Sequence, residues 1–165
     1  KVNLEKELLD RENVVSFRLA TVFGSSPRMR TDLLVNDFVY KAIKDKYIVL
    51  FEENFKRNFI HVRDVANVFE YSINNFEKFK NNIFNVGLSD ANISKLELCE
   101  LIKKYIPNFS IKVDSISNDP DKRNYIVSNK KLEKTGFKPF YSLDDGILEL
   151  IKLYKSIKDY RYRNI

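Results

Sequence analysis

Hydrophobic residues along the chain follow two spacings, one typical of helices and one typical of strands. Apolar side chains three or four positions apart predict amphipathic helices over residues 1–11, 35–43, 65–76, 98–105, 130–135 and 147–157. Short apolar runs, or apolar residues that alternate with polar ones, predict strands over residues 15–23, 48–51, 58–62, 83–87 and 111–113, with an extended stretch at 125–127. The strands at 48–51 and 58–62 could pair with each other or lie in different sheets. Strands that alternate with helices indicate an α/β fold.

Polar residues mark the predicted helix ends. A side chain that can accept a hydrogen bond from a first-turn amide precedes four of the helices. These cap residues are Thr31 or Asp32, Asp64, Ser94 and Ser142. Glu97 and Asp145 complete the capping-box spacing after the two serines, and the helix that follows Ser142 is predicted to be the longest. Gly136 is predicted to end the helix of residues 130–135 in a left-handed conformation.

Composition narrows the class of protein. With 165 residues, 44% of them hydrophobic, and no linker rich in Gly or Pro, the chain is expected to form one unit over residues 1–165. Cys99 is the only cysteine, and no apolar run reaches the roughly 20 residues of a membrane-spanning helix, so a cytoplasmic location is expected. The chain begins at Lys1 without a Met, which suggests a fragment. Its net charge of +6 favours an anionic partner, with phosphate as a candidate.

The most informative segment is residues 57–66, Arg-Asn-Phe-Ile-His-Val-Arg-Asp-Val-Ala. It resembles the Arg-x-Phe-Ile-His-Val-x-Asp-Val-Ala block of the extended short-chain dehydrogenases/reductases, in the NAD-dependent epimerase/dehydratase family. Residues 17–24 resemble the late nucleotide-domain strand of that family. Residues 119–136 resemble its Pro-x-Asp-x-Arg region and the Lys-Leu-x-x-x-Gly-Phe helix that follows, although Pro120 and Arg123 stand one residue closer together than in that pattern.

The resemblance implies the last elements of a Rossmann-type domain, interleaved with a small α/β substrate-binding lobe. It also implies NAD(P)-dependent oxidation of a nucleoside-diphosphate sugar to a keto-sugar, followed by epimerisation or dehydration; reduction of a keto-sugar is also open. The four glycines, Gly24, Gly87, Gly136 and Gly146, are too scattered to form the glycine-rich turn that binds a dinucleotide pyrophosphate. The chain is therefore expected to be the carboxyl-terminal, substrate-binding part of a homodimeric enzyme and to be inactive alone.

Four residues are candidates for substrate binding. The resemblance implies that Arg57 and Arg123 hold the diphosphate, because a guanidinium stays charged and can donate two parallel hydrogen bonds to phosphate oxygens. The alternative is a surface arginine that pairs with a nearby carboxylate, such as Glu52. Asn36 resembles a position near the phosphates, or is an ordinary polar helix residue, and Arg30 lies in a loop that could touch the ligand together with Arg28.

The resemblance also implies cofactor contacts. Ala20, Thr21 and Val22 would line the nicotinamide end of NAD or NADP, unless they are only a buried strand end. Lys1 would be the catalytic lysine four positions after a tyrosine upstream of this sequence, binding the nicotinamide ribose and lowering the pKa of the phenol. Alternatively, Lys1 is simply an exposed first residue.

The histidine and the basic residues are also considered for other roles. His61, the only histidine, is expected to be a packed structural residue, and one His with one distant Cys offers no metal site. The competing function is a basic, non-catalytic nucleic-acid-binding module, in which Lys56-Arg57, Lys103-Lys104, Lys130-Lys131 and residues 161–163 would contact phosphates.

Overall fold

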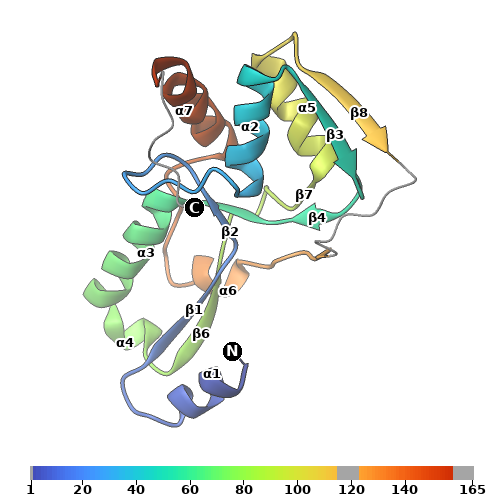
Figure 1. Cartoon of the computed structure of the whole chain (residues 1–165). Helices are drawn as coiled ribbons and strands as arrows, with labels where there is room; N and C mark the ends of the chain where they lie inside the picture. Colours follow the sequence, from blue (N-terminus) through green and yellow to red (C-terminus); the bar gives the residue numbers. More distant parts are fainter. Residues whose placement is uncertain (1, 115–122, 158–165) are drawn as a thin grey trace.

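The computed structural model describes residues 2–114 and 123–157 (Figure 1). The helices are α1 (Val2–Leu9), α2 (Leu34–Lys44), α3 (Val62–Asn74), α4 (Phe76–Phe79), α5 (Lys95–Tyr105), α6 (Lys130–Glu133) and α7 (Leu143–Ser156). The strands are β1 (Val15–Leu19), β2 (Thr21–Phe23), β3 (Tyr47–Phe51), β4 (Lys56–Arg57), β5 (Phe59–His61), β6 (Asn82–Val86), β7 (Ile93–Ser94) and β8 (Ser110–Asp114). This arrangement confirms the predicted α/β class.

Within the described residues the strands form two-stranded pairs. β1 pairs with β6, β2 with β5 and β3 with β8, all parallel, and β4 pairs with β7 in the antiparallel direction. A parallel pair needs a long crossover, and the chain supplies it with the helices between the paired strands. β3 and β5, the two strands whose pairing the sequence leaves open, therefore lie in different pairs.

The lower part of Figure 1 is built around the β1–β6 pair. Phe17 on β1 lies opposite Phe84 on β6, and its ring makes an edge contact with Phe69 of α3 at 5.1 Å between ring centroids. α1 has no buried residue. It is tied to β1 by Glu5, which accepts hydrogen bonds from Ser16 Oγ and Arg18 Nε at 3.0 Å each.

The upper part of Figure 1 holds the β3–β8 pair and the helices α2, α5 and α7. Apolar residues at helical spacing, such as Val35 and Val39 on α2 and Ile147 and Leu150 on α7, are fully buried where these helices pack. Tyr154 of α7 donates a hydrogen bond from its hydroxyl to the backbone oxygen of Asn36 at 3.1 Å. This contact fixes the first turn of α2 against α7.

Three predicted helix ends are confirmed. Ser94 and Ser142 form capping boxes with Glu97 and Asp145, and α7 is the longest helix of the described residues. Gly136 has a φ of +97°, the left-handed conformation expected after α6.

Other details of the sequence prediction are wrong. Leu33 precedes α2 without a side-chain cap, so neither Thr31 nor Asp32 caps that helix. Asp64 does not cap α3, because the helix begins two residues earlier and the His61 ring accepts from the Arg63 amide instead. The predicted strand at 15–23 is broken at Ala20 into β1 and β2, whose pairing partners differ.

The predicted extended stretch at 125–127 is held by asparagine side chains and is not part of a strand pair. Asn92 donates from Nδ2 to the Val127 oxygen at 3.0 Å and accepts from the Val127 amide at 2.8 Å. The Asn124 side chain accepts from the Lys56 amide at 2.9 Å. These contacts hold residues 124–125 against β4 and Val127 against Asn92, the residue before β7.

Candidate functional site

A cavity of about 600 Å³ lies where β1, β2 and β4 end. Its walls come from three separate stretches of sequence. They are residues 19–24 with the loop that leads to α2, then Arg57 and Val62 around β5, then Arg123 and Tyr125 of the extended segment. We call it the arginine cavity, because Arg28, Arg30, Arg57 and Arg123 all line it.

Arg57 is a buried residue in the wall of the arginine cavity. The residue is only 3% exposed, which rules out the alternative of a surface arginine. Its guanidinium donates to the Lys56 oxygen at 3.0 Å and lies 5.5 Å from the centre of the Tyr125 ring, within cation–π range. A buried guanidinium stays charged, so this wall of the cavity attracts anions.

Arg123 lines the same cavity, although it lies 66 residues after Arg57 in the sequence. It is exposed and begins the segment whose next residues, Asn124 and Tyr125, are bound to Lys56 of β4. The two arginines expected to hold one diphosphate therefore share a cavity, although they come from distant parts of the sequence.

The loop between β2 and α2 supplies Arg28 and Arg30. Met29 between them is 8% exposed and anchors the loop in the core, while both arginines are exposed. Asn36 also holds this loop: its side chain accepts from the Gly24 amide at 3.1 Å and donates to the Arg30 oxygen at 2.8 Å. Arg30 additionally binds Asp32, whose carboxylate raises the pKa of the guanidinium through a hydrogen bond.

Asn36 lines the cavity but is only 2% exposed. Both ends of its amide are already engaged with the backbone of the loop. In this structure its side chain shapes the cavity wall, and direct contact with a ligand remains a prediction.

Ala20, Thr21 and Val22 line the cavity at the break between β1 and β2. Ala20 donates its amide to Val86 of β6, and Thr21 donates to the Asn58 oxygen, so the chain changes strand partner at this point. The turn leaves the Thr21 hydroxyl 3.5 Å from the Tyr125 hydroxyl.

Every predicted site residue within the described ranges therefore lines the arginine cavity: Ala20, Thr21, Val22, Arg30, Asn36, Arg57 and Arg123. Lys1 lies outside the described residues, so its predicted catalytic role is not addressed. Sequence reasoning did not single out Tyr125. The signal was its position two residues after Arg123, since alternate residues of an extended chain lie on the same side.

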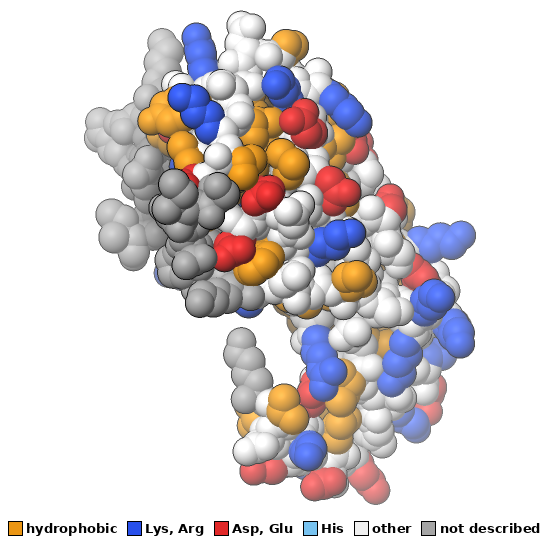
Figure 2. All heavy atoms as spheres, turned by 90° about the vertical axis from the view of Figure 1, so that its right-hand side faces the viewer, with side chains coloured by type: hydrophobic (Ala, Val, Ile, Leu, Met, Phe, Trp, Pro, Cys, Tyr) orange, Lys and Arg blue, Asp and Glu red, His pale blue; other side chains and the backbone are white. Residues whose placement is uncertain are grey.

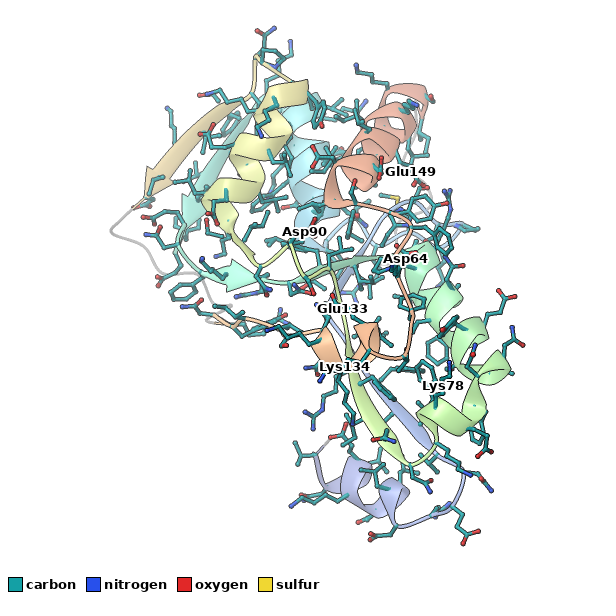
Figure 3. All side chains as sticks on the ribbon, turned by 180° about the vertical axis from the view of Figure 1, so that it is seen from behind. Asp64, Lys78, Asp90, Glu133, Lys134 and Glu149 are labelled. Atoms are coloured by element: carbon teal, nitrogen blue, oxygen red, sulfur yellow. The ribbon has the colours of Figure 1, made fainter. Side chains whose placement is uncertain are left out.

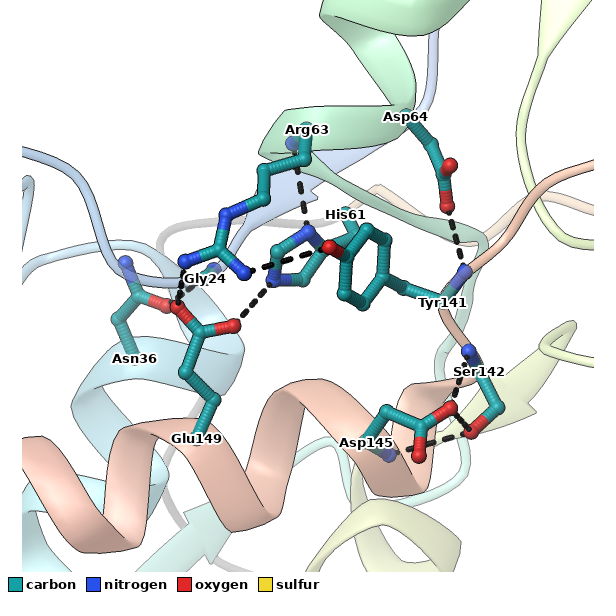
Figure 4. Close-up of polar contacts among 9 residues, drawn as sticks. All are labelled: Gly24, Asn36, His61, Arg63, Asp64, Tyr141, Ser142, Asp145 and Glu149. Carbon is teal, nitrogen blue, oxygen red and sulfur yellow. Dashed lines mark hydrogen bonds and ion pairs between the residues drawn. The ribbon is translucent and has the colours of Figure 1, made fainter.

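His61 is packed between Tyr141, Arg63 and Glu149, as expected of a structural histidine (Figure 4). It is fully buried and stacks on Tyr141 at 4.4 Å between ring centroids. Nδ1 accepts from the Arg63 amide at 3.3 Å, and Nε2 lies 3.0 Å from the Glu149 carboxylate. A nitrogen that accepts carries no proton, so the neutral ring donates from Nε2 to Glu149.

The same histidine limits the shape of the loop above it. Gly24 has a φ of +111°, and a Cβ atom there would lie 2.5 Å from His61 Nε2. Only glycine combines this backbone conformation with this close approach. The turn at Gly24, where the loop between β2 and α2 begins, therefore packs directly against the imidazole ring of His61.

Stability should fall as His61 becomes protonated. Burial lowers the pKa of His61 below its usual value; the charges of Glu149 and Asp64 oppose this effect and that of Arg63 adds to it. The unfolded chain therefore binds the proton first, so stability is complete above the unfolded pKa of about 6.5 and is lost as pH falls below it, with a slope of at most about 1.4 kcal/mol per pH unit. Urea unfolding at pH 8 to 5.5 should show this loss in the wild type and a smaller loss in His61→Gln. If the free energy of unfolding falls with pH equally in the wild type and His61→Gln, the inference of a neutral, buried His61 ring is wrong.

The described residues offer no other reactive centre of an obvious kind. Among them, no group of His, Cys, Asp and Glu side chains has the arrangement of a metal site. Burial raises the pKa of the Cys99 thiol to about 12, so it is not a thiolate near neutral pH. No helix among residues 2–114 and 123–157 has the length and apolar character needed to cross a membrane.

One family of known proteins matches part of the chain. Residues 9–87, which include β1, β2, β5 and most of the cavity wall, match the NAD dependent epimerase/dehydratase family.

Solved structures share the fold. The ADP-L-glycero-D-manno-heptose-6-epimerase of Helicobacter pylori is 22% identical with a TM-score of 0.71, over 94% of this chain and 49% of that protein. The dTDP-glucose 4,6-dehydratase of Bacillus anthracis, solved in complex with NAD, is 18% identical with a TM-score of 0.66, over 89% and 45%. The UDP-glucose 4-epimerase of Thermotoga maritima, solved with UDP-glucose, is 22% identical with a TM-score of 0.67, over 84% and 45%. This chain thus spans about half the length of the solved structures it matches.

Proposed function

We propose that this chain is the carboxyl-terminal, substrate-binding part of an NAD(P)-dependent enzyme that converts a nucleoside-diphosphate sugar. The observation that carries the proposal is the shared cavity of Arg57 and Arg123. A diphosphate offers several acceptor oxygens and negative charge, and guanidinium groups on two sides can donate to it in parallel pairs. Arg28 and Arg30 also line the cavity, where Arg30 is paired with Asp32.

The chemistry is an oxidation of the sugar. A sugar hydroxyl loses a proton to a base and its carbon loses hydride to the nicotinamide of NAD or NADP, which leaves a keto-sugar for epimerisation or dehydration. Ala20, Thr21 and Val22 would adjoin the nicotinamide. Lys1 would lower the pKa of a tyrosine base that lies upstream of this sequence. The similar dehydratase of Bacillus anthracis and epimerase of Thermotoga maritima, solved with NAD and with UDP-glucose, support this assignment.

The cofactor's pyrophosphate would be bound outside this chain, because its scattered glycines form no glycine-rich turn. The isolated 165-residue piece is therefore expected to be inactive. We also propose that the intact enzyme is a cytoplasmic homodimer, a setting that fits the single buried cysteine, Cys99. Light scattering on the full-length protein tests the oligomeric state.

Calorimetry on the full-length protein tests the substrate class. UDP-glucose and dTDP-glucose should each be titrated with and without NAD or NADP, and UDP or dTDP should compete with them. Products are then read by mass spectrometry and NMR: loss of one water indicates dehydration, and new sugar signals at unchanged mass indicate epimerisation. A protein that binds none of these nucleotides would contradict the proposal.

The competing function, a basic nucleic-acid-binding module, has less support. Arg57 is buried, so Lys56-Arg57 is not a surface pair of basic residues. On the face shown in Figure 2, basic and acidic side chains are interspersed and do not form one basic stripe. A salt titration with a generic DNA duplex separates the two functions, since steeply salt-dependent binding without nucleotide-sugar binding would favour the module.

A further inference from the structure

The buried ring of His61 is enclosed by two glycines. The Cβ atom that an alanine would place at Gly24 lies 2.5 Å from the ring's Nε2, and one at Gly146 lies 3.0 Å from its Cδ2. Gly146 belongs to α7, whose apolar face is buried, whereas Gly24 belongs to the loop of residues 24–33, most of which is exposed or half-buried. A ring that moves therefore displaces the loop, because the helix is the more firmly packed of the two.

The Asn36 side chain links the Gly24 turn to Arg30. The Gly24 amide donates to Asn36 Oδ1 at 3.1 Å, and Asn36 Nδ2 donates to the Arg30 oxygen at 2.8 Å. A turn that shifts at Gly24 must break or drag this side-chain amide, and either change moves the backbone of Arg30. The places of the two arginines of the loop, Arg28 and Arg30, in the cavity wall thus depend on where the Gly24 turn lies.

Protonation changes the contacts of the His61 ring at one atom (Figure 4). In the neutral ring, Nε2 donates to Glu149 and Nδ1 accepts from the Arg63 amide. A second proton can only be taken up by Nδ1, where it faces the N–H of that amide, so two donors oppose each other. Relief of this contact requires the ring to turn or shift. Tyr141 stacks on the face of the ring and the two glycines lie against its edge, so such a movement displaces the Gly24 turn.

Charged and titratable groups surround the ring on three elements. They are Glu149 and Asp145 of α7, Arg63 and Asp64 of α3, and Tyr141 in the segment before α7. Burial has the largest effect and lowers the pKa of His61, the charges of Glu149 and Asp64 oppose it, and that of Arg63 adds to it. The ring is therefore neutral near neutral pH and takes up its second proton at a lower pH than an exposed histidine.

We propose that His61 is a positioning residue for the loop of residues 24–33: the neutral ring holds Arg28 and Arg30 in the wall of the arginine cavity, and the protonated ring releases them. Binding of the nucleoside-diphosphate sugar is then coupled to loss of a proton from His61, so affinity falls as pH falls. This inference rests on the proposed function. Direct attraction between a charged histidine and an anionic ligand gives the opposite sign, so the direction of the pH effect distinguishes the two.

Calorimetry with UDP-glucose or dTDP-glucose on the full-length protein measures this coupling. The diphosphate of these ligands takes up no proton between about pH 7.5 and about pH 5.5, and guanidinium groups stay charged throughout. The wild-type affinity should fall by up to about tenfold over this range, the limit for a group with a pKa of at most about 6.5 that must lose its proton before the ligand binds. His61→Gln cannot become charged, so this fall should be absent from it.

Glu149→Gln is the second variant. Its amide oxygen can still accept from His61 Nε2, but the charge that favours the protonated ring is lost, so the fall in affinity should move to lower pH. A residue that only stabilises the fold would not move this midpoint. Glu70→Gln is the matched control, since Glu70 is an exposed carboxylate further along α3, and its pH profile should be that of the wild type.

NMR measures the same coupling at the histidine. The ring signal of His61, identified by its absence in His61→Gln, should titrate at a lower pH when UDP-glucose or dTDP-glucose is bound, because coupling between two sites is reciprocal. A bound anion that acted only through its charge would move the titration to higher pH.

The outcomes separate this inference from the proposed function. If the affinity follows the same pH profile in the wild type and His61→Gln, or rises in the wild type as pH falls, the inference is wrong while the proposed function stands. If the wild type binds neither ligand at any pH, the proposed function fails and the inference fails with it. Thermal unfolding of each variant at each pH confirms that a change in binding is not a loss of fold.

Discussion

Replacing Arg123 with alanine should weaken binding of a nucleoside-diphosphate sugar by about 10- to 100-fold, because each hydrogen bond to a charged group contributes about 1.5–3 kcal/mol. Binding of the corresponding nucleoside diphosphate should weaken by a similar factor, since the arginine is assigned to the phosphates. Arg123 is exposed, so the fold should be unaffected. The change in affinity is measured by calorimetry on the full-length protein.

Two further variants sharpen this test. Arg123→Lys keeps the charge and loses the planar pair of donors, so it should recover only part of the affinity. Arg11→Ala removes an exposed arginine outside the cavity and should leave binding unchanged. Wild-type affinity in Arg123→Ala would remove this arginine from the diphosphate site.

Asp64→Ala should destabilise the protein by about 3–5 kcal/mol, because it removes a fully buried carboxylate that accepts three hydrogen bonds. Asp64 is fully buried on α3, and Figure 3 shows it beside the segment that leads into α7. Its carboxylate accepts from the amides of Phe140 at 2.9 Å and Tyr141 at 3.0 Å, and from Asn67 Nδ2 at 3.2 Å. Urea unfolding followed by circular dichroism measures the loss.

Asp64→Asn should be less harmful, since one amide oxygen can still accept while the amide nitrogen meets a donor. Asp90→Asn is the control at an exposed position and should change stability by less than about 0.5 kcal/mol. A loss of under 1 kcal/mol in Asp64→Ala, which we take as about the value of one ordinary hydrogen bond, would show that water replaces the carboxylate.

Local patterns in the sequence predicted local structure well. The capping boxes at Ser94 and Ser142 depend on residues three positions apart, and the left-handed end at Gly136 depends on one residue. Such features need no knowledge of the tertiary fold. Periodicity likewise placed the main helices, with ends that shifted by a few residues.

Long-range contacts were where prediction failed. Aspartate is a residue type that commonly caps helices, which is why Asp64 was predicted to be a cap. Its backbone partners are instead the amides of residues 140 and 141, which no local pattern links to it. β4 and β7 are two residues each and were missed as a pair, because so short a strand has no periodicity. The cavity residues were found through the family resemblance, whereas Tyr125, which lies between the two motifs of residues 119–136, was not.

The arginine cavity has one more consequence, because its walls come from the beginning, the middle and the later part of the sequence. No single segment can form the binding surface, so a ligand that occupies it binds only the fully assembled chain. At 100 times its dissociation constant such a ligand would stabilise that assembled state by about 2.7 kcal/mol. Cells that hold a large pool of such a ligand would thereby slow the turnover of this protein, and depletion of the ligand would shorten its lifetime.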